Sequence, residues 1–322
     1  MMINELKKLS NINVATITLN PAIDHTLYLT ELNVGWVNRV TKERFDPGGK
    51  GINVASFLSH FGLSLTVTGF LGKNNMNIFK TFFKKKGFLD KFILVDGETR
   101  SNIKIVDKKN KDITDINLSG FNIQDSDVTG LLGLIEILSQ SNEWFVLSGS
   151  LPQGVPDIIY KEIIEQLNGK NKKVVLDASG TALLKGIEAA PFIIKPNIDE
   201  LNEIFENKAD SIDKVVNFTK KISNNKGISY VIVSMGEKGA VFTKGDKSVH
   251  VIPPRTNIKS TVGAGDAMVA GFIEGCNLNL GLEECAGFST AVAMGTLVQE
   301  GPYLTDLETI NNFVDNVCIK TL

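Results

Sequence analysis

The sequence predicts an α/β fold in which helices cover both faces of a mostly parallel central sheet. Short apolar runs rich in valine and isoleucine alternate along the chain with segments that have the apolar periodicity of amphipathic helices. Such runs are typical of parallel strands, because both faces of these strands are buried. A strand, a helix and a further strand, repeated in this order, build a parallel sheet with helices on its two sides.

Six apolar runs are predicted to be strands of this sheet. They are residues 14–19, 65–70, 144–147, 174–176, 192–194 and 230–233. Amphipathic segments such as 156–167 and 212–223 are predicted helices between them. Polar residues follow the strands at Asn20, Asp24, 148–150, Asp177, 195–197 and 234–236. Since ligands of such folds bind at the carboxyl ends of the strands, these positions predict the rim of an active site.

Two segments, residues 26–45 and 91–118, interrupt the alternation of strands and helices. Both have the pattern of exposed β-ribbons, and the second is broken by a turn at 107–110. We expect them to form a small β-sheet lid within a single domain that spans residues 1–322. An uncovered lid edge invites pairing with another chain, so we also expect a homodimer formed through the lid.

The composition argues against several classes of function. The chain has 322 residues, a net charge of −2 and a pI near 6.0, which disfavours a nucleic-acid-binding surface. Its apolar runs are shorter than the about 18 residues of a membrane span. Residues 1–10 are polar and lack the apolar segment of a signal peptide. We therefore expect a cytoplasmic protein with no nucleic-acid or membrane partner.

The cysteines and histidines give no sign of a metal centre. Cys276, Cys285 and Cys318 are odd in number and include no C-x-x-C pair, so they are expected to be reduced thiols. The three histidines are scattered, without the spacing of metal ligands. A zinc site or a histidine-based triad is therefore not expected, and a general base would be a carboxylate.

The most informative motif is a turn of small residues directly before an apolar helix, formed by Gly263, Ala264, Gly265 and Asp266. The first N–H groups of a helix are free to bind an anion, and glycine lets that anion approach the backbone closely. An aspartate at this place would repel a bound phosphate unless it takes a proton from an attacking hydroxyl. The alternative is a short glycine turn in which Asp266 is an ordinary N-cap.

A second glycine-rich turn enters a helix at Gly48, Gly49, Lys50 and Asn53. It is not a Walker A loop, because the spacing of that motif is absent. The glycines expose backbone amides to a hydroxylated ligand, Asn53 can donate and accept hydrogen bonds, and Lys50 suits a sugar phosphate. The alternative is a plain helix-start turn.

Two further residues could contact a sugar phosphate. Asp24 follows the first strand and could accept hydrogen bonds from vicinal hydroxyls, although a turn aspartate is the alternative. Arginine is rare in this chain, so Arg100 between two lid segments suggests an oxyanion partner, with a surface ion pair as the alternative.

Asn197 and Glu200 open a helix and lie three residues apart, so both face the same way. Glu200 could order the waters of a Mg²⁺ ion, which keeps much of its hydration. An N-cap asparagine with glutamate at the third helical position is also an ordinary capping box.

The glycine turn at Gly48, the motif from Lys195 to Glu200 and the turn at Gly263 together resemble the PfkB (ribokinase-like) carbohydrate kinases. The match runs in order over nearly the whole chain. Residues 18–24, 48–55, 99–104 and 148–152 look most like the 1-phosphofructokinase and tagatose-6-phosphate kinase branch, and 114–117 favour the former. The resemblance implies a ribokinase-like three-layer α/β/α sandwich with a small β-sheet lid.

The resemblance also implies roles for individual residues, with ATP and Mg²⁺ as cofactors. Asp266 would be the catalytic base, and Gly263, Ala264 and Gly265 would form the anion hole. Asp24, Gly48, Gly49 and Asn53 would hold the sugar, and Lys50, Arg100 and Arg39 its phosphate. Asn197 and Glu200 would organise Mg²⁺, through water, together with the ATP phosphates. The nucleotide would be bordered by Lys195, Ser234, Gly236, Gly239, Gly263, Gly265, Gly287 and Ala291.

The reaction implied is phosphorylation of the 6-hydroxyl of fructose 1-phosphate to give fructose 1,6-bisphosphate. Tagatose 6-phosphate and fructose 6-phosphate are alternative acceptors. A non-catalytic regulator that binds a sugar or a nucleotide on the same fold is the alternative outside the enzymes.

Overall fold

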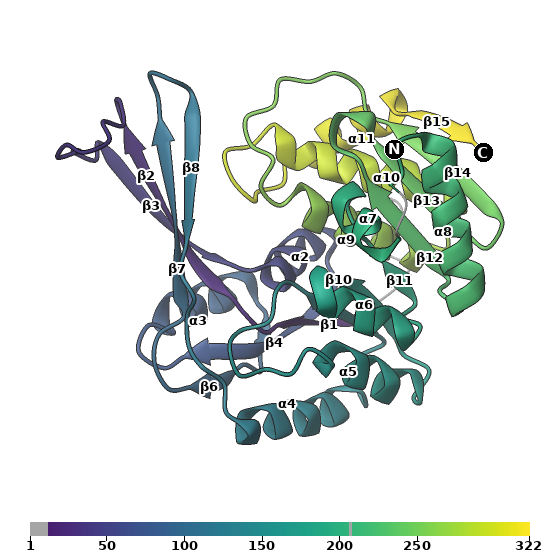
Figure 1. Cartoon of the computed structure of the whole chain (residues 1–322), viewed down its shortest axis with the longest axis horizontal. Coiled ribbons are helices and arrows are strands. Elements are labelled where there is room, and N and C mark those ends of the chain that lie inside the picture. The colour runs from purple at the N-terminus through teal and green to yellow at the C-terminus, as the bar shows by residue number, and fades with distance from the viewer. Residues whose placement is uncertain (1–11, 206–207) are drawn as a thin grey trace.

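The computed structural model describes residues 12–205 and 208–322, and the prediction made for residues 1–10 lies outside these ranges. Within them, eleven strands form the main sheet, which we call the body sheet (Figure 1). Its strands are β1 (Asn13–Thr18), β4 (Ser64–Gly72), β5 (Leu89–Asp90), β6 (Ile93–Val95), β9 (Trp144–Ser148), β10 (Lys173–Asp177), β11 (Ile193–Ile194), β12 (Tyr230–Ser234), β13 (Ala240–Lys244), β14 (Lys247–Ile252) and β15 (Cys318–Thr321).

The strand order is β15-β14-β13-β12-β11-β10-β9-β1-β4-β5, with β6 also paired to β4. All six predicted strands lie side by side from β12 to β4 and run parallel. The strands β13, β14 and β15 extend this sheet in antiparallel pairing. The predicted mostly parallel sheet is therefore confirmed.

Helices cover both faces of the body sheet. They are α2 (Lys50–Leu58), α3 (Asn77–Lys86), α4 (Asp125–Leu138), α5 (Ile159–Asn168), α6 (Gly180–Glu188), α7 (Ile198–Ile204), α8 (Ile212–Lys226), α9 (Ala264–Asn277), α10 (Leu282–Leu297) and α11 (Leu307–Asn316), with short 3₁₀ turns η1 (Ser59–Phe61) and η2 (Gly236–Lys238).

Two apolar cores lie between the sheet and the helices on its two faces. One joins the sheet to α2, α3, α9, α10 and α11, and the other joins it to α4 through α8. Successive residues of β1 point into opposite cores, as the pleat of a strand requires: Val14 into the first, Ala15 into the second. The predicted three-layer α/β/α sandwich is confirmed.

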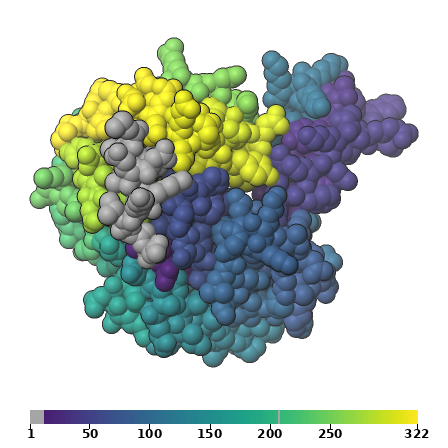
Figure 2. All heavy atoms as spheres, turned by 180° about the vertical axis from the view of Figure 1, so that it is seen from behind, coloured from purple at the N-terminus to yellow at the C-terminus, as the bar shows by residue number. Residues whose placement is uncertain are grey.

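A separate four-stranded sheet, the lid, projects from this body (Figure 1). Its strands are β3 (Lys42–Gly48), β2 (Ala22–Leu29), β7 (Arg100–Asp107) and β8 (Asp112–Asn117), in that order across the sheet. The lid strands thus begin before residue 26, and β6, within the expected segment 91–118, pairs with β4 of the body instead. Seen from behind, the lid is an arm that stands off the body (Figure 2).

The two faces of the lid differ in polarity. Strand pairing puts a polar set on the face toward the body: Asp24, Thr26, Arg44, Asp46, Asn102, Lys104, Asp115 and Asn117. The opposite face is mainly apolar, with Leu27, Phe45, Ile103, Ile105 and Ile116. The polar face therefore suits a hydrophilic ligand, and the apolar one suits another protein surface.

In the described part of the chain, each helix is too short or too polar to cross a membrane.

Candidate active site

The carboxyl ends of the parallel strands meet the first turns of α2 and α9, and the predicted motifs converge there. Asp266 lies in the first turn of α9, and Gly263 is the N-cap residue with φ 82°. This left-handed conformation favours glycine. A side chain would also be crowded there, because a Cβ placed at Gly263 would lie 3.0 Å from the Cβ of Pro302.

Asp266 is buried and hydrogen-bonded at the centre of this site. Asn53 on α2 donates from Nδ2 to Oδ2 of Asp266 at 2.8 Å. Burial, with a further contribution from the charge of Asp177, raises the pKa of Asp266 to about 7, against the opposing effect of Lys50. A carboxylate whose pKa lies near neutral pH can both take up and release a proton, which suits a general base.

Asp177, the last residue of β10, anchors two lysines. Its Oδ1 lies 3.1 Å from the Nζ of Lys50 and 3.3 Å from the Nζ of Lys195. Burial raises the pKa of Asp177, but the charges of Lys195 and Lys50 outweigh it and hold the pKa below its usual value. Its Oδ2 is buried and has no hydrogen-bond partner among the described residues. The sequence predicts Asp177 at the rim of the active site but does not predict its ion pairs with Lys50 and Lys195.

Lys50 pairs with Asp177 of the body, and its side chain remains 40% exposed. Burial lowers its pKa, but the charges of Asp177 and Asp266 more than compensate and raise the pKa above its usual value. The resemblance implies that Lys50 holds the phosphate of the substrate, and the structure shows this lysine paired with Asp177. Lys195 reaches the turn formed by residues 263–266, because a Cβ placed at Gly265 would lie 3.2 Å from its Nζ. The absence of a side chain at Gly265 therefore leaves room for the ammonium group.

The second glycine turn brings Asp24 close to the start of α2. Gly49 is the N-cap of α2 with φ 128°, and a Cβ placed at Gly48 would lie 2.5 Å from Oδ2 of Asp24. Asn102 donates from Nδ2 to Oδ1 of Asp24 at 3.1 Å. Burial raises the pKa of Asp24 despite this hydrogen bond and the charge of Lys104. Asp24 thus has one oxygen available beside the glycine turn.

Arg100 lies close to the same region, whereas Arg39 does not. Arg100 donates from Nη2 to the carbonyl of Asn20 at 3.3 Å, and Asn20 donates to Oγ of Ser150 at 3.2 Å. The buried Nε of Arg100 has no hydrogen-bond partner among the described residues. Arg39 is exposed in the connection between β2 and β3, and neither Arg39 nor Arg100 is one of the residues that line the cleft described below.

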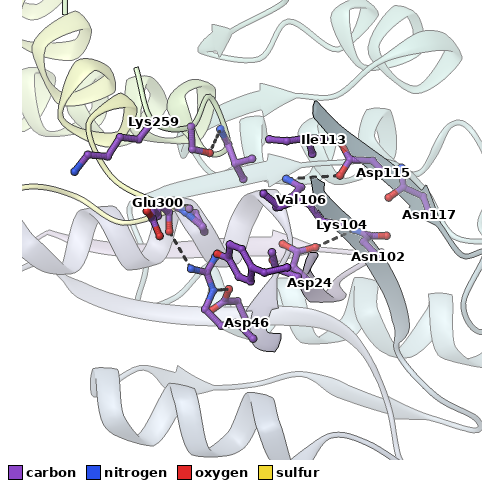
Figure 3. A pocket seen from close by; sticks show the side chains of 17 residues that line it. Asp24, Asp46, Asn102, Lys104, Val106, Ile113, Asp115, Asn117, Lys259 and Glu300 are labelled. Carbon is purple, nitrogen blue, oxygen red and sulfur yellow. Dashed lines mark hydrogen bonds and ion pairs between the residues drawn. The ribbon is translucent and has the colours of Figure 1, made fainter. Parts of the chain in front are cut away.

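A cleft of about 410 Å³ opens between the polar face of the lid and two body segments, residues 259–262 and 300–302. In Figure 3, Asp24, Asn102 and Lys104 of the lid lie across this cleft from Lys259 and Glu300. The lining is strongly charged and of mixed sign. It can therefore bind a small ligand that carries both hydroxyls and an anionic group.

Asn197 and Glu200 form the capping box that was the alternative to a metal role. Oδ1 of Asn197 accepts from the N–H of Glu200 at 2.8 Å, and Oε2 of Glu200 accepts from the N–H of Asn197 at 2.8 Å. Among the described residues, groups of three or more metal-ligating side chains are absent. The capping box uses one carboxylate oxygen of Glu200, and the other oxygen takes no part in it.

The residues expected at the nucleotide divide into two groups. Ser234, at the end of β12, forms an isolated β-bridge with Asn197. Gly236 and Gly239 follow it in the chain, and both have positive φ. Gly287 and Ala291, by contrast, are buried within α10, where Gly287 lies against Ile319 and Ala291 belongs to the apolar core. The structure brings the first group to the site and leaves these two in the packing of α10.

The chain resembles known proteins along most of its length. A family model described as pfkB family carbohydrate kinase matches residues 17–310. A 1-phosphofructokinase of Rhodobacter capsulatus is 39% identical over 97% of this chain and 98% of its own. A 1-phosphofructokinase of Bacillus subtilis is 35% identical over 96% and 100%. The structure of phosphofructokinase-2 from Escherichia coli in complex with substrates and products superimposes with a TM-score of 0.87, at 26% identity over 94% and 99%.

Proposed function

The chain belongs to the pfkB family of carbohydrate kinases, and from this premise we propose that it uses ATP to phosphorylate the 6-hydroxyl of fructose 1-phosphate. The observation that carries the proposal is the buried carboxylate of Asp266, held by Asn53 in the first turn of α9 with a pKa near 7. A base of this strength can take the proton of the attacking hydroxyl at neutral pH.

The other residues of the site position the reactants. The N–H groups at Gly263, Ala264 and Gly265 would face the charge that develops on the transferred phosphoryl group, and Lys195 adds a cation beside them. The N–H of Ala264 also donates to the carbonyl of Thr261 at 3.4 Å. Lys50, fixed by Asp177, adds a second cation within this group. The ion pairs with Asp177 hold both ammonium groups in position, so little rearrangement is needed during the transfer.

The site also fits Mg²⁺ bound mainly through water. Mg²⁺ prefers oxygen ligands and commonly keeps several waters, so one or two carboxylates suffice. The carboxylate oxygen of Glu200 that lies outside the capping box is a donor of this kind. Mg²⁺ supplies positive charge that neutralises the phosphates of ATP when it is bound. Ser234, Gly236 and Gly239 would border the nucleotide.

The names of the curated relatives support fructose 1-phosphate as the acceptor, because those at 35–39% identity are 1-phosphofructokinases. Asp24, Gly49 and Asn53 would hold the sugar hydroxyls. Arg100, whose Nε is unpaired in the described structure, would bind the phosphate.

An assay of ADP release with fructose 1-phosphate, fructose 6-phosphate and tagatose 6-phosphate tests this proposal. We expect kcat/KM to be highest for fructose 1-phosphate. A higher value for either of the other two would reassign the acceptor, and turnover of none would favour a regulator that binds without catalysis. Arg100→Ala should raise the KM for the sugar phosphate and leave the KM for ATP unchanged.

The same proposal treats residues 1–322 as one kinase domain that forms a homodimer through the lid. The apolar outer face supports this, since Phe45 remains 50% and Ile116 45% exposed in the single chain. Light scattering on the purified protein should give twice the chain mass, and Phe45→Glu should give monomers. An unchanged mass for the variant would place the interface elsewhere. The free thiols Cys276, Cys285 and Cys318 support a cytoplasmic location.

A further inference from the structure

Four residues tie the lid to the body at one end of the cleft. Arg44 and Asp46 lie two residues apart on β3, so they share a face of the lid. Nη1 of Arg44 donates to the carbonyl oxygen of Glu300 at 3.1 Å, and the hydroxyl of Tyr303 donates to Oδ1 of Asp46 at 2.7 Å. Figure 3 shows Asp46 and Glu300 on the two sides of this contact. We call Arg44, Asp46, Glu300 and Tyr303 the lid bridge.

Further contacts inside the lid bridge fix its geometry. Nε of Arg44 donates to Oδ2 of Asp46 at 2.5 Å, and the guanidinium carbon lies 5.8 Å from the centre of the Tyr303 ring. The Asp46 side chain is only 13% exposed. Burial and the hydrogen bond to Asp46 raise the pKa of Tyr303 to about 12, so its hydroxyl remains a donor at neutral pH. Partly buried charges are screened less by salt than exposed ones.

The body side of the lid bridge reaches the turn at Gly263. A Cβ placed at Gly301, which has φ 109°, would lie 2.9 Å from Nη2 of Arg44. The next residue, Pro302, packs against Gly263, where a Cβ would lie 3.0 Å from the Cβ of Pro302. One short segment therefore contacts the lid on one side and the turn that precedes Asp266 on the other.

We propose that the lid bridge is a positioning device, which fixes the lid over the cleft and holds residues 300–303 against the turn at Gly263. The proposal rests on the proposed function, because it takes the sugar phosphate to bind in the cleft below the lid. Asp24 and Asn102 on the lid would then stand at a set distance from Asp266 on the body. Without the bridge the lid can pivot, and the hydroxyl of the substrate is placed less accurately against its base.

Tyr303→Phe tests the proposal, because it removes the hydroxyl and keeps the ring. We expect the KM for the sugar phosphate to rise about tenfold, as for a lost hydrogen bond to a charged group. The KM for ATP should rise less than that for the sugar phosphate, because the lid bridge reaches the nucleotide side only through the packing of Pro302 on Gly263. Asp46→Asn should have a similar effect, and the double variant no more than the larger single effect, as for residues that act as a unit. Tyr230→Phe on β12, where the ring packs on Phe272, is the matched control.

Hydrogen exchange of the protein without ligands provides a readout that does not depend on activity. We expect faster exchange in Tyr303→Phe at residues 42–48 and 259–263, and unchanged exchange in α8. Unchanged exchange in both segments would overturn the proposal, as would an equal rise in the KM for both substrates. If the wild-type protein turns over none of the three sugar phosphates, the proposed function fails. In that case hydrogen exchange alone tests whether the lid bridge fixes the lid. Faster exchange in Tyr303→Phe would support this role, and unchanged exchange would overturn it.

Discussion

The body and the lid hold their charged side chains in different ways. In the body, the carboxylate of Asp177 is fully buried and pairs with Lys195, whose side chain is only 5% exposed, as well as with the more exposed Lys50. In the lid, the pair of Lys104 and Asp115 is 3.7 Å apart, and these side chains are 25% and 55% exposed. Buried charges keep fixed positions and shifted pKa values, whereas exposed charges are screened by water and can move. The body is therefore suited to the chemical step, and the lid to recognition of the substrate.

The largest expected effect is that of Asp266→Asn in the body. The amide keeps the shape of the side chain but cannot accept a proton, so kcat should fall by about 10²–10⁴-fold. Binding of ATP, measured by calorimetry, should be retained. Asp213→Asn is a matched control, because Asp213 occupies the first turn of α8 and lies outside the site. Near-normal turnover by Asp266→Asn would remove the general-base assignment.

The next effect concerns stability. Asp177→Asn leaves the ammonium groups of Lys50 and Lys195 together without their carboxylate. Removal of one partner from a buried ion pair, here that of Asp177 and Lys195, costs about 3–5 kcal/mol of unfolding free energy. Urea denaturation, followed by circular dichroism, measures this quantity. A loss below about 1 kcal/mol would show that water screens the pair far more than its burial indicates.

The dependence of activity on pH follows from the pKa of about 7 at Asp266. Only the ionised form accepts a proton, so kcat/KM should fall about tenfold per pH unit below pH 7 and level off above it. The charge of Asp177 contributes to the raised pKa, so Asp177→Asn should move this acidic limb to lower pH. A flat profile from pH 5 to 8 in the wild-type protein would contradict the role of Asp266.

The raised pKa of Asp266 also makes the stability of the protein depend on pH, in the direction opposite to that of the activity. Asp266 binds its proton more tightly in the folded state than in the unfolded chain, where the pKa is near 3.8. The stability it contributes is therefore present at low pH and is lost as the pH rises from about 4 to 7. Asp266→Asn should remove this part of the pH dependence of unfolding.

The sequence predicts those features that depend on local patterns. Buried parallel strands are continuous apolar runs, so residues 144–147 and 230–233 were recognised, and the glycine turn at Gly263 was located by its residue types. The pairing of Lys50 with Asp177 was not foreseen, because it joins residues 127 positions apart. Only the order of the strands brings these two side chains together.

The edges of the two sheets were also less predictable. The strand Ile93–Val95 has the alternation of the lid, yet it pairs with β4, since a short strand takes whichever edge the chain path offers. In the same way Asn197 and Glu200 satisfy a capping box by their spacing alone. The spacing cannot tell whether the free carboxylate oxygen also serves Mg²⁺.

The smallest expected effect on stability is that of Asp115→Asn. This change in the lid is the counterpart of Asp177→Asn in the body. The partner, Lys104, is again a lysine, but both side chains face the cleft and remain in contact with water. Exposed ion pairs contribute only about 0–1 kcal/mol, so Asp115→Asn should leave the urea midpoint nearly unchanged. Its effect should fall instead on the KM for the sugar phosphate, because the change frees Lys104 and makes the cleft more positive. A loss of stability as large as that of Asp177→Asn would mean that the lid is as rigidly organised as the body, and the division between chemistry and recognition would then fail.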